Sequence, residues 1–273
     1  MRALLDARGL APKKSLGQNF LVDASACTRI ARLACEFHPS RVIEIGAGTG
    51  ALTAALATAC TSLTAIEIDD GLIELLRDRE DLANVTFEHA DALKFDFATY
   101  AQGGPWTATG NLPYNVATPI ITQFVEMEDG PETIVVMVQR DVADRFIARP
   151  GTPAYGSLSV AMQFSTAVEK VLTLGPTAFF PRPKIDSTVV RFRRLPQPVA
   201  PVDDLALFRQ VVRAAFAYRR KTLANSLLLA LGESRDTIVA SILASDLSPE
   251  IRGEQLDIAA FARLANNLAT RRI

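Results

Sequence analysis

The sequence predicts an α/β protein with a mostly parallel sheet and helices on both of its faces, followed by a small all-helical C-terminal domain. From Arg41 to Val138, short β-branched runs bounded by Gly, Asp or Pro alternate with helical stretches. This alternation is typical of a parallel sheet covered on both faces. Beyond a break containing three prolines, the chain from Asp203 to Ile273 shows only helical periodicity.

The individual elements follow from the same patterns. Strands are predicted at 41–45, 63–68, 84–89, 106–109 and 133–138, and helices at 24–37, 52–59, 71–79 and 119–126. Two later β-like runs, 168–174 and 187–194, flank a proline-rich loop. Because Pro196, Pro198 and Pro201 form a stiff break, we expect one domain over 1–198 and a helical domain over 199–273.

Composition excludes several classes of protein. The 273 residues are 49% hydrophobic, enough for a buried core, yet no apolar run approaches the ~20 residues that span a bilayer. The N-terminal stretch lacks the apolar core of a secretory signal, so we expect a cytoplasmic protein with no membrane partner. The three cysteines and two histidines have no metal-like spacing, which predicts reduced thiols and no metal site.

The net charge of −1 hides an uneven distribution. Residues 36–100 hold 12 acidic and 4 basic side chains, whereas residues 182–225 hold 10 basic and 3 acidic ones. A basic segment of this density can follow a phosphate backbone, although any one of its cations is more often just part of a solvated helix face.

A glycine-rich turn follows the first predicted strand of the alternating region. Gly46, Gly48 and Gly50 let the backbone turn sharply and approach a ligand closely. Their G-x-G-x-G spacing differs from the G-x-G-x-x-G of dinucleotide binders. The neighbouring acid Glu44 disfavours a pyrophosphate and suits a cationic or zwitterionic ligand.

Two further acids stand at the ends of the next two strands. Glu67, at the end of the second strand, can accept hydrogen bonds from both hydroxyls of a ribose. Asp91, after the third, can accept one from an adenine amino group. Either acid alone could be a surface or capping residue, but at successive strand ends they describe an adenosine pocket.

The segment Gly110-Asn-Leu-Pro-Tyr114 carries the most specific chemistry. The N6 lone pair of adenine is delocalised into the ring, so N6 becomes a nucleophile only if acceptors draw its N–H groups toward tetrahedral geometry. The Asn111 side-chain carbonyl and a backbone carbonyl beside Pro113 can do this. The Tyr114 ring can stack on a base that has left its helix, a contact worth ~1–3 kcal/mol.

These motifs together resemble the ribosomal RNA adenine N6,N6-dimethyltransferase family. The resemblance runs through GQNFL (17–21), EIGAGTG (44–50), Glu67, DAL (91–93) and NLPYNVATP (111–119). It continues through MVQRDVADRF (137–146), YGSLSVAMQF (155–164), FFPRPKIDSTVVRF (179–192) and RRKTLANSL (219–227). The later motifs point to the small-subunit (16S) branch. Ala47 departs from the proline of some family members, and we expect no loss of function from it.

The resemblance implies a Rossmann-like class I methyltransferase sheet that binds S-adenosylmethionine, releases S-adenosylhomocysteine and uses no metal. In this assignment Asn19 and Leu21 cover the cofactor, Gly46 backs its methionine part, and Asn111 lies between cofactor and target. The complete implied cofactor set is Gln18, Asn19, Leu21, Gly46, Gly48, Glu67, Ile68, Asp91, Ala92 and Asn111.

The resemblance also implies the site of the target base. The catalytic set is Asn111, Leu112, Pro113, Tyr114 and Phe180, in which the rings of Tyr114 and Phe180 sandwich the adenine. Residues 1–198 then form the catalytic domain and residues 199–273 an RNA-binding domain. Within the second, the basic run Arg219, Arg220 and Lys221 docks RNA phosphates.

The implied reaction is direct methyl transfer to N6 of two adjacent adenosines near the 3′ end of small-subunit ribosomal RNA, within an assembling small ribosomal particle, by a monomeric enzyme. The sequence favours four alternatives less, and the last of them least. They are methylation of large-subunit RNA, as in the related antibiotic-resistance enzymes, methylation of adenine in DNA, a non-catalytic RNA-binding factor of the same fold, and a nicotinamide dehydrogenase.

Overall fold

The chain folds into two compact units. The computed structural model describes residues 2–271, and the side chains of Ala3, Leu4, Tyr114 and Asn115 lie outside that description. One unit comprises the chain up to Ala143 together with Val168–Arg194, and the other comprises Asp144–Ala167 together with the chain from Leu195 onward.

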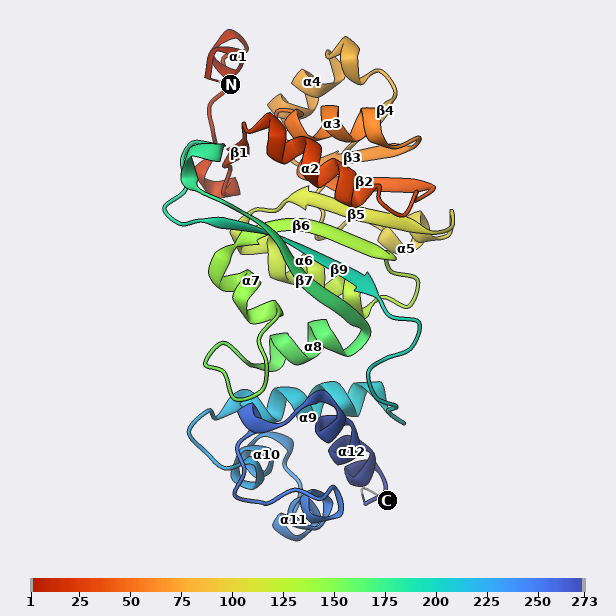
Figure 1. Ribbon diagram of the computed structural model, residues 1–273, viewed down its shortest axis with the longest axis vertical. Helices are drawn as coiled ribbons and strands as arrows, with labels where there is room; N and C mark the ends of the chain where they lie inside the picture. The colour runs from red at the N-terminus through yellow and green to blue at the C-terminus, as the bar shows by residue number, and fades with distance from the viewer. Residues whose placement is uncertain (1, 272–273) are drawn as a thin grey trace. The chain divides into compact units, whose positions relative to one another are not determined.

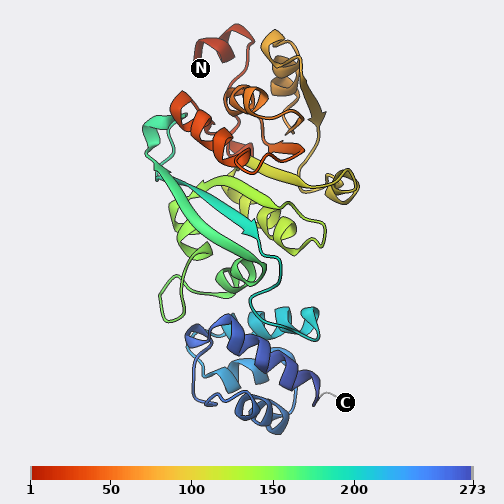
Figure 2. The same cartoon turned by 45° about the vertical axis from the view of Figure 1, so that its right-hand side comes forward.

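The first unit is built on a seven-stranded sheet (Figures 1 and 2). Its strand order is β4 (Val85–His89), β3 (Leu63–Glu67), β2 (Arg41–Ile45), β5 (Trp106–Asn111), β6 (Thr133–Gln139), β9 (Ser187–Arg194) and β7 (Thr166–Leu174). The strands from β4 to β6 run parallel, and β9 runs antiparallel to β6. The carboxyl ends of the five parallel strands therefore meet at one edge, where ligands bind in open α/β sheets.

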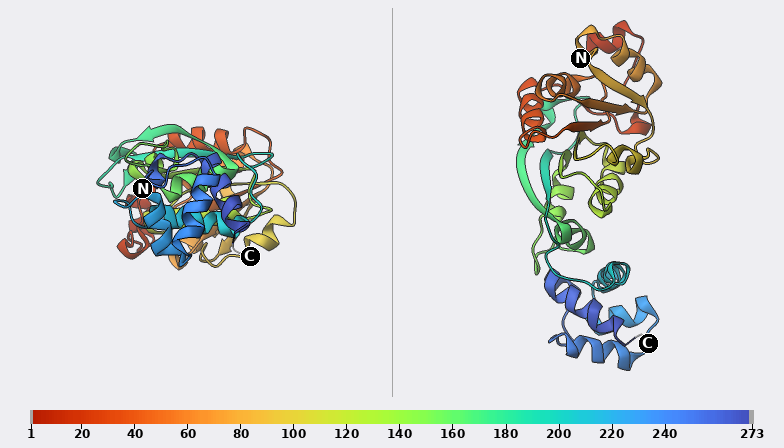
Figure 3. Two further views of the ribbon diagram at one scale, coloured as in Figure 1. Left: turned by 90° about the horizontal axis from the view of Figure 1, so that it is seen from below. Right: turned by 90° about the vertical axis from the view of Figure 1, so that its right-hand side faces the viewer.

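Helices cover both faces of this sheet, as Figure 3 shows in its right-hand view. Helices α2 (Ala24–Ala34) and α3 (Ala51–Ala59) pack apolar side chains such as Ile30 and Leu56 against one face. On the other face, α5 (Phe97–Ala101) and α6 (Tyr114–Glu126) build an aromatic cluster with β5. There the Phe97 ring lies 6.1 Å from Trp106 and 4.7 Å from Phe124, centroid to centroid. The predicted α/β class is confirmed.

Short elements complete the first unit. An N-terminal segment contains α1 (Arg2–Ala7), a 3-10 turn η1 (Lys14–Leu16) and β1 (Phe20–Leu21), and β1 pairs antiparallel with β8 (Phe179–Phe180). Helix α4 (Asp70–Arg77) and two 3-10 turns, η2 (Glu80–Leu82) and η3 (Pro176–Ala178), lie elsewhere in the unit. Helix α7 (Arg140–Phe146) carries the chain from this unit into the second.

The second unit is helical. It contains α8 (Ser157–Ser165), α9 (Leu205–Ala217), α10 (Leu223–Leu231), α11 (Arg235–Ala244), η4 (Gly253–Gln255) and α12 (Ile258–Ala269). Side-chain caps begin four of these helices, at Asp204, Thr222, Ser234 and Asp257.

The division between the units differs from the single boundary predicted after residue 198. The second crossing falls at 194/195, four residues earlier, and the segment 144–167 belongs to the helical unit. The physical reason is the apolar face of α8. Val160 and Phe164 are buried in the helical core, and the Phe164 ring lies 4.5 Å from that of Phe208. No helix within residues 2–271 is long and apolar enough to cross a membrane.

Candidate active site

The glycine-rich turn after β2 brings bare backbone to the carboxyl edge of the sheet. Gly46 and Gly48 have φ angles of 73° and 58°, in the left-handed region that suits glycine. A Cβ atom at Gly48 would meet the Phe20 ring at 3.0 Å. Glycine is therefore favoured at both positions, and the missing side chains leave bare backbone at the edge for a ligand.

The Glu67 carboxylate ties this turn to the end of β3. Glu67 Oε2 accepts a hydrogen bond from the Gly48 N–H at 2.7 Å, and Oε1 accepts from Ile68 (2.9 Å) and Asp69 (3.0 Å). The side chain is only 5% exposed. Burial raises the pKa of Glu67, and the three backbone hydrogen bonds oppose that rise by stabilising the charged form.

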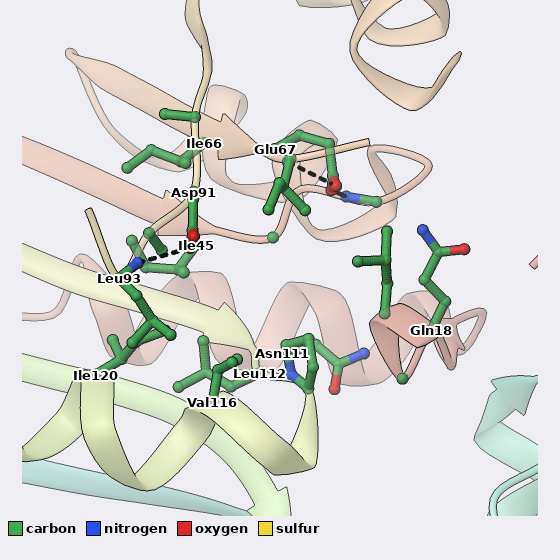
Figure 4. A pocket seen from close by; sticks show the side chains of 18 of the residues that line it. Gln18, Ile45, Ile66, Glu67, Asp91, Leu93, Asn111, Leu112, Val116 and Ile120 are labelled. Atoms are coloured by element: carbon green, nitrogen blue, oxygen red, sulfur yellow. Dashed lines mark hydrogen bonds between the residues drawn. The ribbon is translucent and has the colours of Figure 1, made fainter. Parts of the chain in front are cut away.

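A pocket opens beside Glu67 (Figure 4). Its empty space, which includes part of the open solvent at the mouth, is about 930 Å³. The walls are mainly apolar, from Ile45, Ile66, Leu93, Val116 and Ile120. Glu67 and Asp91 are the only acidic side chains among the lining residues, and no basic side chain lines the pocket in the described part of the chain. Such a slot suits an uncharged planar ring flanked by hydrogen-bond donors.

Asp91 lies at the end of the pocket formed by the loop after β4. Its Oδ1 accepts the backbone N–H of Leu93 at 3.0 Å, which closes a tight turn and places Ala92 and Leu93 against the pocket. Figure 4 shows Asp91 on the same side of the pocket as Ile66. The carboxylate keeps further lone pairs for a donor on the ligand.

The N-terminal loop forms the opposite wall. Ser15, Leu16, Gly17, Gln18, Asn19 and Phe20 line the pocket. The loop is held at one end by the pairing of β1 with β8 and at the other by Asp69, which accepts hydrogen bonds from Lys13 Nζ and Gln18 Nε2, both at 2.8 Å. The N-terminal loop is thus held over the carboxyl edge of the sheet.

Asn111, the last residue of β5, completes the rim. Its Nδ2 donates to the Asn19 carbonyl at 2.8 Å, so its Oδ1 is left as an acceptor. The next residue, Leu112, is buried, and its N–H donates to the Met137 carbonyl at 3.2 Å. The Pro113 carbonyl accepts the N–H groups of Val116 and Ala117 and so opens α6. Within residues 2–271, no group of three or more His, Cys, Asp or Glu side chains is placed to hold a metal ion.

Comparison with known proteins agrees with this geometry. The family model described as ribosomal RNA adenine dimethylase matches residues 9–269. The chain belongs to this family. A relative from Geobacillus kaustophilus, ribosomal RNA small subunit methyltransferase A, is 42% identical over 98% of this chain and 94% of its own length. The protein of the same name from Pseudomonas aeruginosa is 42% identical over 94% of both chains.

Two solved structures share the fold of the family. A dimethyladenosine transferase from Plasmodium falciparum matches with a TM-score of 0.77 and 22% identity over 93% of this chain and 98% of its own. The 23S ribosomal RNA methyltransferase ErmE matches with a TM-score of 0.70 and 26% identity over 92% of this chain and 100% of its own. The Rossmann-like methyltransferase class predicted from the sequence motifs is confirmed.

The fold gathers most of the predicted site residues around one pocket. Its lining includes Gln18, Asn19, Gly46, Gly48, Glu67, Ile68, Asp91, Ala92, Asn111, Leu112 and Pro113. Leu21 is buried and instead lines a smaller adjoining hollow with Glu44. The basic run at 219–221 is exposed in the helical unit, just before the cap of α10.

Two predicted aromatic residues stand apart from this set. The Phe180 ring is partly buried against Leu5, Phe20 and Leu72, and Phe180 is not among the residues that line the pocket. Its strand partner Phe20 does line it. The predicted stacking of Tyr114 concerns a side chain outside the described ones, so it stays a prediction.

Sequence reasoning missed the apolar walls of the pocket. Val116 was overlooked because the helix was predicted to start at Pro119, a residue type favoured in the first turn, whereas α6 begins at Tyr114. Ile45 and Ile66 are ordinary strand residues in the sequence. The available signal was their position next to Gly46 and Glu67, at the ends of adjacent parallel strands.

Glu44 is the least expected feature of the site. Its side chain is buried behind the glycine turn, and its Oε2 has no hydrogen-bond partner among the described residues. Burial raises the pKa of Glu44 to about 8, and the charge of Glu67 adds to the rise. The folded protein therefore keeps this carboxyl protonated at neutral pH, whereas the unfolded chain releases the proton near 4.5.

This difference predicts a pH dependence of stability. Because the pKa is raised by folding, the contribution of Glu44 is complete below about pH 4.5 and is lost as the pH rises toward and through about 8. Glu44→Gln removes the titration and keeps the shape. The free energy of unfolding of the wild type, measured with urea, should fall more steeply between pH 5 and 9 than that of Glu44→Gln. Parallel curves would contradict the assignment.

Proposed function

We propose that this protein binds S-adenosylmethionine in the pocket and transfers its methyl groups to N6 of adenosines in small-subunit ribosomal RNA. Membership in the ribosomal RNA adenine dimethylase family supports the reaction, and relatives at about 40% identity named for the small subunit support the substrate. The main structural support is the Asn111 side chain, whose Oδ1 atom is an available acceptor at the rim of a pocket suited to a nucleoside.

The residues present fit the cofactor. The buried Glu67 carboxylate would accept hydrogen bonds from the ribose hydroxyls, and Asp91 would accept one from the adenine amino group. The apolar side chains between them would cover the two faces of the adenine ring. Leu21 and Glu44 belong to the adjoining hollow behind Gly46, which would take the cationic methionine part. When bound, the cofactor supplies a methyl group on a positively charged sulfur.

The protein's own task is then to prepare the nucleophile. The Asn111 Oδ1 atom and the backbone carbonyl of Leu112, which precedes Pro113, would accept the two N6–H groups and localise the lone pair of N6 on one side. Holding the amine at reacting distance removes much of the entropic barrier. The lining contains no lysine or histidine that could serve as a strong base within the described residues. The proton lost after transfer therefore passes to solvent.

We further propose that the target is a pair of adjacent adenosines near the 3′ end of the RNA, held in an assembling small ribosomal particle. A single chain carries the whole pocket, which supports a monomeric enzyme. The rings of Tyr114 and Phe180 remain our candidates for stacking on the target base. A cytoplasmic location agrees with a ribosomal substrate.

Asn111→Ala tests the chemistry. Removing one positioned acceptor should lower the rate of methyl transfer about 100-fold or more. Labelled methyl transfer is measured in parallel on unmethylated small particles, large particles and DNA, and the modified nucleoside is identified by mass spectrometry. The proposal requires N6,N6-dimethyladenosine in small-particle RNA. Label in large-particle RNA or in DNA alone would assign another substrate, and cofactor binding without transfer would indicate a binding factor.

The exposed run Arg219, Arg220 and Lys221 is proposed to contact RNA phosphates. Replacing all three with Ala should weaken RNA binding and reduce the slope of log affinity against log salt by about 2 to 3, since each phosphate contact releases counterions. Arg235→Ala, which removes an exposed cation elsewhere in the helical unit, is the control. A triple variant with the wild-type slope would rule out this contact.

A further inference from the structure

Asp69 is a buried carboxylate that does not line the pocket, yet three hydrogen bonds converge on it. Its side chain is 3% exposed and caps α4 by accepting the Gly71 N–H at 3.1 Å. A cap needs only this bond. The other two, from Lys13 Nζ and Gln18 Nε2, come from the N-terminal loop more than 50 residues earlier in the chain.

These bonds close the loop on itself as well as onto α4. The Lys13 N–H donates to Gln18 Oε1 at 2.7 Å, so the same Gln18 amide joins both ends of the loop to Asp69. Burial alone would raise the pKa of Asp69, but the hydrogen bonds from Lys13 and Gln18 outweigh it and lower the pKa. The carboxylate is therefore charged when it receives them, which strengthens both bonds.

The loop held in this way contacts Asn111 directly. Asn19 follows Gln18, and its side-chain amide donates to the Gly17 carbonyl at 3.1 Å, which fixes the backbone between them. The Asn19 carbonyl then accepts the Asn111 Nδ2–H at 2.8 Å. This bond decides which end of the Asn111 amide faces away from the loop, and so whether an oxygen or an NH₂ group meets the target amine.

We propose that Asp69 is a positioning residue for methyl transfer: by fastening Gln18 and Lys13, it holds the Asn19 carbonyl where that carbonyl orients the Asn111 side chain. The inference rests on the proposed role of Asn111. The N-terminal loop is then part of the reaction as well as a cover for the cofactor. Loosening the loop should lower turnover at saturating cofactor, which a mere cover would not do, as well as raise the KM for the cofactor.

The test compares Asp69→Ser with Asp78→Asn. Serine keeps a cap acceptor for the Gly71 N–H but cannot reach Lys13 and Gln18 together. Asp78→Asn removes the exposed ion pair with Arg8, in which the side chains are 47% (Arg8) and 58% (Asp78) exposed, so it controls for any general loss of docking onto α4. Asp69→Ser should lower kcat roughly tenfold, the change expected when one charge-assisted hydrogen bond is lost, while Asp78→Asn stays within about twofold of the wild type.

A second readout follows the Asn111 amide itself. The chain has seven asparagines, so ¹⁵N-asparagine labelling gives few side-chain signals, and Asn111→Asp assigns the one of interest. Asp69→Ser should shift this signal and speed its hydrogen exchange. Lys13→Met removes one contact to Asp69 and leaves the α4 cap intact, so it should shift the Asn111 amide signal and speed its hydrogen exchange to a smaller degree. This variant tests the connection from Asp69 to Asn111 even if Asp69→Ser fails to fold.

The inference would be overturned if Asp69→Ser changed neither the Asn111 amide signal nor kcat. It would also be overturned if Asp78→Asn lowered kcat as much as Asp69→Ser does. If the wild type transfers no methyl group, the proposed function fails, but the amide signal still tests the connection from Asp69 to Asn111.

Discussion

The site depends on one buried carboxylate that joins two adjacent strands. Glu67 accepts the Gly48 N–H from the turn after β2 and the N–H groups of Ile68 and Asp69 from its own strand end. A carboxylate with so little exposure would be costly without partners. The three donors stabilise it and also fix the glycine turn, Asp69 and thus the N-terminal loop. The shape of the pocket follows from this arrangement of backbone donors.

The pocket is completed by segments that the sheet does not supply. The N-terminal loop is added through the short β1–β8 pairing and through Asp69, and it contributes one wall and the carbonyl that contacts Asn111. Glu44 lies behind the glycine turn as a protonated acid with a raised pKa. A cationic ligand beside it would favour its ionised form, so binding of such a ligand should lower the pKa of Glu44.

The sequence was sufficient for the parts of this site that depend on strand ends and special residue types. Gly46, Glu67, Asp91 and Asn111 follow successive strands, and parallel strands bring their carboxyl ends together. The sequence was insufficient for features that are determined by packing between distant segments. The start of α6 was hidden because Pro119 resembles a first-turn proline, and α8 joined the helical unit through Phe164 and Phe208, a contact that no local pattern encodes. The position of Phe180, packed beside Phe20, depends on the β1–β8 pairing in the same way.

Calorimetric titration with S-adenosylhomocysteine shows whether the Glu67 carboxylate binds the nucleoside, as we propose. Glu67→Gln should bind the ligand with an affinity about 10- to 100-fold lower, since hydrogen bonds to a charged group contribute ~1.5–3 kcal/mol. Glu88→Gln, an exposed carboxylate on the neighbouring strand β4, should bind like the wild type. If a folded Glu67→Gln variant binds with undiminished affinity, Glu67 does not hold the nucleoside in this pocket.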